Sequence, residues 1–265
     1  MNPSNSLASD AWSALSKNRA AWFSAIALTT MVLLVLLGPL VSPYEVDQTN
    51  WSKLAKPPSM QDGHIFGTDD LGRDLFVRTM YGGRISLMVG IVATLVSVLI
   101  GVSYGAISGF VGGKVDSIMM RIVDVLYAMP FLFFVILLMV FFGRSIFLIF
   151  VAIGAVNWLD IARIVRGQTL TIKGKEFVDA AKAGGVSTFR IIFRHIVPNL
   201  MGIVVVYVAL TVPQVILVES FLSFLGLGVQ EPMTSWGALV NQGARQMESS
   251  PWILLFPALF FCLLY

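Results

Sequence analysis

The chain has 265 residues, of which 57% are hydrophobic and only 12% are charged. Soluble domains carry roughly 25% charged residues, and the mean hydropathy here is +0.82, so the composition excludes a soluble globular domain. The net charge of +3 is small, and its distribution along the chain is more informative than its sum. The single cysteine, Cys262, excludes an internal disulfide and a cluster of thiolate metal ligands.

Stretches without charged residues set the expected organisation. Because a helix needs about 20 apolar residues to cross a bilayer, we expect an all-α integral membrane protein with about six transmembrane helices. The fourth stretch is short and can extend through Asp160, and the sixth reaches the end of the chain, so we expect the last helix to be truncated. The six stretches cover residues 20–44, 85–113, 125–143, 145–159, 196–218 and 249–265.

The lysines and arginines predict the orientation. Eleven of the eighteen lie in segments that are cytoplasmic if the N-terminus is inside, which the positive-inside rule favours. A basic loop that only contacts anionic lipid is the alternative. The expected order is a cytoplasmic tail over residues 1–21, a first transmembrane helix over 22–42, a periplasmic segment over 43–84 and a core of five transmembrane helices over 85–265.

The basic loop at residues 163–198 predicts a helical hairpin. Two sets of residues recur at the spacing of one helix face, on either side of a break at Gly184-Gly185. Pro198 suits the first turn of the next span. Such a hairpin can offer one helix to the groove of a partner protein. The two sets are Phe177, Ala180, Ala181 and Gly184, then Phe189, Ile192, Phe193 and Ile196.

This loop resembles the EAA loop, E-A-A-x3-G-x9-I-x-L-P, of permease subunits in binding-protein-dependent ABC importers. The chain departs from the pattern at three positions, with Asp179 for Glu, His195 for Ile and Val197 for Leu. The resemblance implies that the loop couples the chain to ATP-binding subunits. The coupling residues that it implies are Asp179, Ala180, Ala181, Gly185 and Pro198.

Other segments are similar to the dipeptide, oligopeptide and nickel permeases of that family. Residues 66–74 resemble their F-G-T-D-x-x-G-R-D signature, and residues 83–87, 158–170 and 219–228 are also similar. The resemblance therefore covers nearly the whole chain. It implies a type I ABC importer permease (MetI-like) fold and a multi-pass subunit of the bacterial inner membrane that forms half of a peptide pathway, with the residue 163–198 loop as its cytoplasmic coupling loop.

The resemblance also implies the partners. These are a second permease subunit, two ATP-binding subunits, a periplasmic peptide-binding protein and membrane lipid, but no nucleic acid. The chain lacks the phosphate-binding motif G-x4-G-K-[ST], so we expect no cofactor in this chain, with ATP and Mg held by the partner subunits. Oligopeptides are the expected substrate; dipeptides, nickel and antimicrobial peptides are the alternatives within the family.

Small residues and prolines mark two further features of the predicted spans. Four glycines recur every four residues, which lets helix backbones approach closely in lipid, so we expect this stripe to pack against another helix; pore lining is the alternative. Pro130 and Pro213 fall inside predicted spans, where proline kinks or breaks a helix and suits a pathway that opens on alternate sides. The stripe comprises Gly101, Gly105, Gly109 and Gly113.

Glu219 is expected to end the fifth span near the outer interface. It would line the outer gate there or pair with Arg84 or Arg78. Two structural ion pairs within helices are expected elsewhere, Asp124 with Arg121 and Asp160 with Arg163. Residues 221–230 are too short to span, and we expect them to form a re-entrant flap or a docking surface.

An enzyme and a secondary transporter are the competing classes. An intramembrane serine protease needs a histidine within the membrane, but His64 and His195 both lie outside the predicted spans. No pair of histidines or cluster of carboxylates indicates a metal site. The sequence also lacks an inverted repeat with broken helices in matching halves, which would indicate a secondary transporter.

Overall fold

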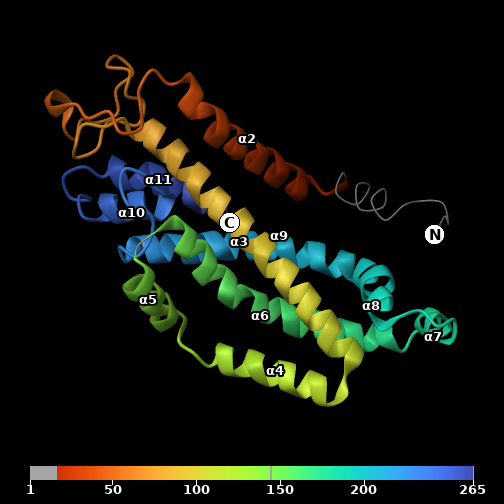
Figure 1. The fold of residues 1–265 in the computed structure, drawn as a ribbon. Helices are drawn as coiled ribbons and strands as arrows, with labels where there is room; N and C mark the ends of the chain where they lie inside the picture. Colours follow the sequence, from red (N-terminus) through yellow and green to blue (C-terminus); the bar gives the residue numbers. More distant parts are fainter. Residues whose placement is uncertain (1–16, 144, 265) are drawn as a thin grey trace. The chain divides into compact units, whose positions relative to one another are not determined.

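Helices make up nearly all of the regular secondary structure (Figure 1). The computed structural model describes residues 17–143 and 145–264, and in these ranges it contains two isolated β-bridges and no strand. The chain divides into two compact units, which we name and describe separately. The terminal unit comprises Met1–Arg84 and Thr234–Tyr265, and the hairpin unit comprises Ile85–Met233.

Four helices are long and apolar enough to cross a membrane. They are α2 (Arg19–Val41), α3 (Leu75–Val111), the Phe147–Lys173 part of α6 (Ile146–Lys173), and a continuous helix over Thr188–Phe224. A bent pair, α4 (Gly113–Tyr127) and α5 (Phe131–Phe142), passes the same test as a fifth. The last apolar stretch forms only the short α11 (Trp252–Cys262) within the described residues.

Three predicted boundaries differ from the structure. The helix α3 begins at Leu75, so the last part of the predicted segment 43–84 is helical, and α6 continues to Lys173, well into the predicted loop 163–198. The stretch 125–143 is not one straight span, because α4 and α5 meet at 81°. In the first two cases the helix extends past the apolar stretch into charged residues, whereas the third difference has another cause.

The bend between α4 and α5 has a local cause. Pro130 lies directly before α5 with φ −59° and ψ 121°, an extended conformation that cannot continue α4. A proline also disfavours helical geometry at the residue before it. Pro213 behaves differently: it lies inside α9 (Val197–Phe224), which continues through it. Of the two prolines that were predicted to kink or break a helix, Pro130 lies at a break between two helices and Pro213 does not.

In the terminal unit, the connecting segment (residues 42–74) is organised by a buried carboxylate. Asp69 accepts hydrogen bonds from the Arg73 backbone at 2.9 Å and from Arg73 Nε at 2.7 Å, and Arg78 Nε lies 3.3 Å from it. Asp74 starts α3, because its Oδ1 accepts from the Val77 backbone at 2.9 Å. This segment also contains the short 3-10 helix η1 (Trp51–Lys53).

Glycine is required at two turns of the connecting segment. Gly67 and Gly72 have φ of +79° and +72°, values that side chains with a Cβ rarely adopt. A Cβ at Gly72 would lie 2.0 Å from the Asn50 carbonyl oxygen, and one at Gly67 would lie 2.5 Å from that of Lys56. The signature over residues 66–74 thus specifies a compact turn that positions the start of α3.

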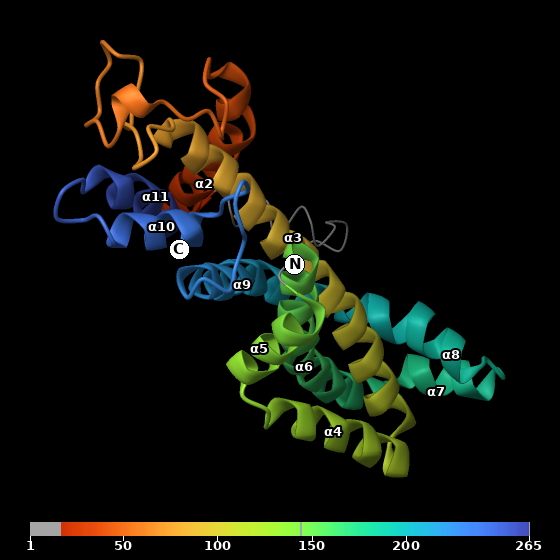
Figure 2. The same ribbon diagram turned by 60° about the vertical axis from the view of Figure 1, so that its left-hand side comes forward.

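Close helix contacts complete the terminal unit. Gly38 of α2 faces Met80 of α3, since a Cβ there would lie 2.8 Å from Met80 Cγ. The helices α10 (Trp236–Ala244) and α11 lie side by side (Figures 1 and 2). Trp236 is fully buried, and its indole nitrogen donates to the Thr79 carbonyl at 2.9 Å. This bond joins α10 to the first turns of α3.

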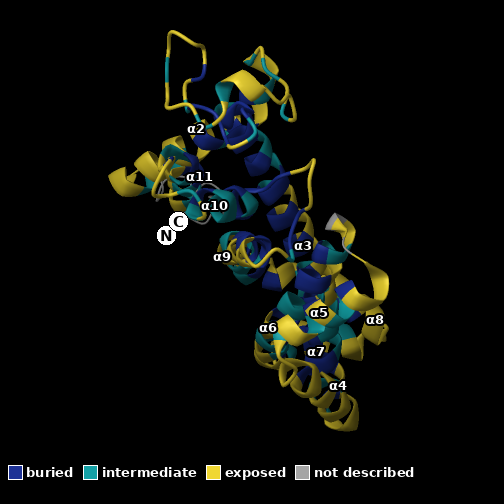
Figure 3. Cartoon of the chain, turned by 90° about the vertical axis from the view of Figure 1, so that its left-hand side faces the viewer, coloured by how far each residue is buried: buried dark blue, intermediate teal, exposed yellow. Residues whose placement is uncertain are grey.

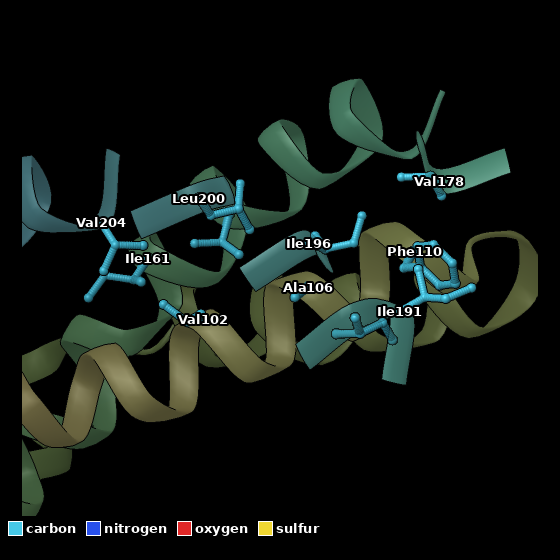
Figure 4. Packing of buried hydrophobic residues seen from close by; sticks show 11 residues of the cluster. Val102, Ala106, Phe110, Ile161, Val178, Ile191, Ile196, Leu200 and Val204 are labelled. Atoms are coloured by element: carbon cyan, nitrogen blue, oxygen red, sulfur yellow. The ribbon is translucent and has the colours of Figure 1, made fainter. Parts of the chain in front are cut away.

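The hairpin unit is built around α6, which contacts α4, α5 and α9. Its apolar core joins α3 and α6 to residues 178–204, while most of α4 is exposed (Figures 3 and 4). This core connects the helices of the unit to the segment that follows α6. Its buried members are Val102, Ala106, Phe110, Ile161, Val165, Val178, Ile191, Ile192, Ile196, Leu200 and Val204.

Three glycines of the predicted stripe lie where α3 meets α6. A Cβ at Gly101, Gly105 or Gly109 would lie 2.9, 2.4 or 2.8 Å from a carbonyl oxygen of α6. Only a residue without a side chain permits this approach. Gly113 does not share it, because α3 ends at Val111 and Gly113 starts α4 with φ +57° and no atom within 4 Å of a Cβ.

Candidate functional site: the coupling hairpin and a buried carboxylate

The coupling hairpin (residues 174–198) begins with α7 (Glu176–Ala183), which ends in a Schellman motif. The Val186 N–H donates to the Ala181 carbonyl at 3.1 Å, and the Gly185 N–H donates to that of Lys182 at 3.0 Å. Gly185 takes the left-handed position of this motif, with φ +72°. Glycine is therefore required at position 185 by the backbone conformation and not by lack of space, since no atom lies within 4 Å of a Cβ built there.

The second half of the hairpin runs into the next span without a break. The helix α8 (Thr188–Ile191) continues through the π-helical turn η2 (Ile192–Ile196) into α9, giving one helix over Thr188–Phe224. Pro198 lies in the first turn of α9, as predicted, although α9 continues directly from η2. Proline lacks an N–H and disturbs the preceding turn, and a π turn is one way in which a helix accommodates such a residue.

The hairpin has an inner and an outer face. Val178, Ile192 and Ile196 are buried in the core of the unit, as Figure 4 shows for Val178 and Ile196. The predicted faces were thus partly misassigned, because each mixed inner and outer residues. Adjacent helix positions point about 100° apart, so Ile192 and Phe193 need not share a face. The outer residues are Phe177, Ala180, Gly184, Phe189 and Phe193.

Aromatic side chains dominate the outer face. Phe189 is 71% exposed, and its ring lies 4.5 Å from that of Phe193, one helical turn further on. Asp179 is also exposed and forms an ion pair with Lys182 at 3.0 Å. An exposed pair of this kind contributes little to stability. The outer face therefore offers apolar surface and a screened carboxylate, whereas the inner face holds the hairpin in place.

Phe110, near the end of α3, lies directly beneath the hairpin. Its ring belongs to the buried core, and the amino groups of Lys173 and Lys182 lie 5.6 and 5.8 Å from its centre. Both distances are in the range of cation–π attraction. Lys182 of α7 and Lys173 of α6 thus both contact the ring of Phe110 near the end of α3.

Two ion pairs join α4 to α6. Arg166 donates to both oxygens of Asp116, each at 2.6 Å, and Arg163 Nη2 donates to Asp124 at 2.8 Å. Sequence spacing instead predicted pairs within helices for Asp124 and Arg163. The Asp116 pair was missed altogether, because its residues are 50 positions apart and no local pattern links them. A carboxylate three residues after Gly113 was the only available signal.

Glu219 lies in the interior of the hairpin unit. It is fully buried within α9, which continues to Phe224, so the helix does not end at Glu219, and its expected place near the outer interface stays a prediction. Its carboxylate accepts hydrogen bonds from Ser223 at 2.7 Å, Ser86 at 3.0 Å and Ser220 at 3.5 Å. These hydroxyl groups offset the cost of burying a carboxylate.

Ser223 connects this carboxylate to the segment 225–230. Its hydroxyl also accepts from the Val229 N–H at 3.4 Å, and a Cβ at Gly228 would lie 2.3 Å from the Ser223 Cα. The segment that we predicted as a flap or docking surface is thus fastened to α9. Arg84 donates to the Val35 and Leu36 carbonyls and Arg78 lies beside Asp69, and the expected pairing of Glu219 with one of these arginines stays a prediction.

Within the described residues, no group of three or more histidine, cysteine, aspartate or glutamate side chains is placed to hold a metal ion. A small apolar cavity of about 190 Å³ lies at the bend between α4 and α5. Leu126, Phe131 and Trp158 are among its lining residues. Met129 and Phe131, the two neighbours of Pro130 in the chain, both line this cavity.

These features define a multi-pass α-helical membrane protein with a helical hairpin whose aromatic outer face is exposed. The model of the family described as "Binding-protein-dependent transport system inner membrane component" matches residues 97–265, and that of the "N-terminal TM domain of oligopeptide transport permease C" matches residues 6–58. The chain belongs to the family of binding-protein-dependent transport system inner membrane components. The expected all-α permease fold is thereby confirmed.

Several curated relatives are similar over almost the whole chain. The oligopeptide transport system permease protein OppC of Escherichia coli (strain K12) is 60% identical over 96% of this chain and 84% of its own length. OppC of Haemophilus influenzae is 56% identical over 97% and 83%. The dipeptide transport system permease protein DppC of Bacillus subtilis is 49% identical over 98% and 81%. The chain is therefore a multi-pass membrane permease, and these relatives are themselves permease subunits.

Proposed function

We propose that this chain is the transmembrane subunit of an ATP-driven oligopeptide importer and forms half of its translocation pathway. The observation that carries the proposal is the 60% identity to an oligopeptide permease over 96% of the chain. The other half of the pathway belongs to a second permease subunit. A periplasmic peptide-binding protein delivers the substrate.

In this proposal the coupling hairpin docks on an ATP-binding subunit. Its outer face supports this role, since Phe189 and Phe193 are exposed beside a well-defined glycine turn. Exposed aromatic residues are typical anchors of protein interfaces. The chain itself holds no cofactor, and the partner subunits bind ATP and Mg. The N-terminus is cytoplasmic, and the membrane is the bacterial inner membrane.

The coupling residues have different parts in this docking. Gly185 sets the turn, and Ala180 leaves the outer face of α7 narrow enough for close approach. Ala181 packs against the core, Asp179 adds a negative charge at the exposed start of α7, and Pro198 lies just after the π-helical segment. The hairpin is therefore a rigid surface rather than a flexible arm.

We place the gate in the hairpin unit at Glu219 and at the helix irregularities Pro130 and Pro213. A carboxylate buried among serines on a membrane helix is a functional candidate by default. The bend at Pro130 supplies a hinge between α4 and α5. A substrate passing this region would have to displace packed side chains, which is what a closed gate requires.

Dipeptide transport is the second candidate. It is favoured by the 49% identity to DppC of Bacillus subtilis over 98% of the chain. The identity to OppC of Escherichia coli is higher, so oligopeptides are our first choice.

The test is uptake by proteoliposomes that contain the chain with its second permease subunit and its two ATP-binding subunits. Labelled tetrapeptide and labelled dipeptide are offered separately with the binding protein, with and without Mg-ATP on the nucleotide side. We expect ATP-dependent uptake of the tetrapeptide. Uptake of the dipeptide alone would favour the second candidate, and uptake that ignores ATP would refute an ATP-driven importer.

A further inference from the structure

Asp116 is a nearly buried carboxylate that joins three helices of the hairpin unit. It lies in the first turn of α4, is 9% exposed, and receives both nitrogens of the Arg166 fork from α6 at 2.6 Å. The hydroxyl of Ser108, on α3, donates to the same carboxylate. A bidentate arginine–carboxylate pair fixes orientation as well as distance. Asp116 therefore sets the position of α4 relative to α3 and α6.

Little else holds α4 in place. It buries only Asp116 and Val123, and its apolar residues Ile118, Ile122 and Val125 are exposed. A hydrogen bond from the Tyr104 hydroxyl to the Met119 carbonyl at 2.8 Å adds a further polar contact. Because α4 has so few buried apolar side chains, its position within this chain depends mainly on polar contacts.

The Asp116–Arg166 pair links the helix that leads into the coupling hairpin, α6, to the helix that leads into the α4–α5 bend, α4. Arg166 is about two turns before the end of α6 at Lys173, and α7 of the hairpin starts at Glu176. Ser108 precedes Phe110, whose ring supports the hairpin. In the other direction, α4 leads to the 81° bend before α5. A displacement of the hairpin can thus reach α4 through this pair.

We propose that Asp116 and Arg166 are positioning residues that transmit movement of the coupling hairpin to the bent pair α4–α5. The proposal rests on the ATP-driven function proposed above. The pair links two elements without taking part in either ATP binding or peptide contact. The Asp116 side chain is 12% exposed and that of Arg166 34%. A bidentate pair on a nearly buried carboxylate suits this task, since it keeps its geometry while the helices that carry it move.

The chain supplies its own control. The second ion pair between α4 and α6, Asp124 with Arg163, has a similar distance of 2.8 Å, but its side chains are 59% and 39% exposed. Exposed pairs are screened by water and ions and fix geometry weakly. Asp124→Asn therefore changes the same chemistry between the same two helices, at a carboxylate that is exposed rather than nearly buried.

The experiment compares Asp116→Asn and Asp124→Asn in the complete reconstituted importer. The quantity measured is the number of peptides transported per ATP hydrolysed, together with the amount of complex in the membrane. For Asp116→Asn we expect this ratio to fall roughly two- to thirtyfold, the range for residues that carry coupling. Asp124→Asn should leave it close to the wild-type value. Arg166→Lys keeps the charge but loses the fork, so it should lower the ratio as well.

A merely structural role predicts another result. If Asp116 only stabilised the fold, transport and hydrolysis would fall together with the amount of complex, and an unchanged ratio would overturn the proposal. Equal losses of the ratio in Asp116→Asn and Asp124→Asn would overturn it too. If Asp116→Asn fails to assemble, Arg166→Lys provides the same comparison. Failure of the proposed function is distinguishable, because the wild-type complex would then show no peptide-stimulated hydrolysis.

Discussion

The connecting segment and the coupling hairpin both join membrane helices, but they are held by different interactions. In the connecting segment, the carboxylate of Asp69 is buried beside Arg73 and beside Arg78 of α3, and glycine turns bring backbones into contact. The hairpin has no such network among its described residues: Val178, Ile192 and Ile196 hold it by apolar contacts, and its polar groups are largely exposed. The connecting segment is thus held by its own buried polar contacts, whereas the hairpin leaves an aromatic surface exposed.

The largest effect should come from Asp69→Ala, which tests the charge network of the connecting segment. Removing one member of a buried ion pair leaves the remaining charges without compensation and costs about 3–5 kcal/mol. We expect a marked loss of folded protein, measured as membrane abundance and as thermal stability in detergent. The adjacent, exposed Asp70 is the control, and Asp70→Ala should change stability much less. Similar losses in the two variants would contradict the distinction between the segments.

A smaller effect is expected at the turn of the hairpin, and it should be conformational. Gly185→Val places a β-branched residue at φ +72° and should cost about 1–2 kcal/mol. Gly185→Asn should cost less, because asparagine tolerates the left-handed region. Peptide-stimulated ATP hydrolysis should follow the same order. Equal impairment by both residues would mean that contact with a partner, rather than backbone conformation, requires glycine here.

The smallest effect on stability should come from Phe189→Ala on the outer face. Because Phe189 is 71% exposed, its truncation should change the free energy of unfolding by less than about 0.5 kcal/mol. Peptide-stimulated ATP hydrolysis should nevertheless fall if this side chain is an anchor for the ATP-binding subunit. Phe141, which is 75% exposed in α5, is the matched control, and Phe141→Ala should leave hydrolysis unchanged. Normal coupling in Phe189→Ala would remove the aromatic face from the docking surface.

Local patterns predicted what depends on neighbours in sequence. The four-residue spacing of Gly101, Gly105 and Gly109 indicated a close helix contact, which α6 supplies, and Gly184-Gly185 indicated the hairpin turn. The same spacing failed at Gly113, since a repeat does not reveal where its helix ends. Composition alone predicted an all-α membrane protein, and the family resemblance predicted its class.

Long-range contacts were beyond such patterns. Arg166 finds Asp116, and Ser86 finds Glu219 from 133 positions away, so neither partner could be read from local spacing. Glu219 was expected near the interface because a carboxylate is costly in lipid. Three serine hydroxyls reduce that cost, and their convergence is a product of the tertiary fold. The connecting segment illustrates the same limit, because its motif was recognised by resemblance while the role of Asp69 in it required the structure.

The π turn η2 has a geometric consequence for the helix that contains it. A π turn accommodates one residue more than an α turn, and an extra residue corresponds to a rotation of about 100° in an α-helix. The direction in which Phe189, before the turn, points around the helix axis is therefore not fixed by the apolar stripe of α9 beyond the turn. One uninterrupted rod can in this way present one side to a water-soluble protein and a different side to its membrane neighbours.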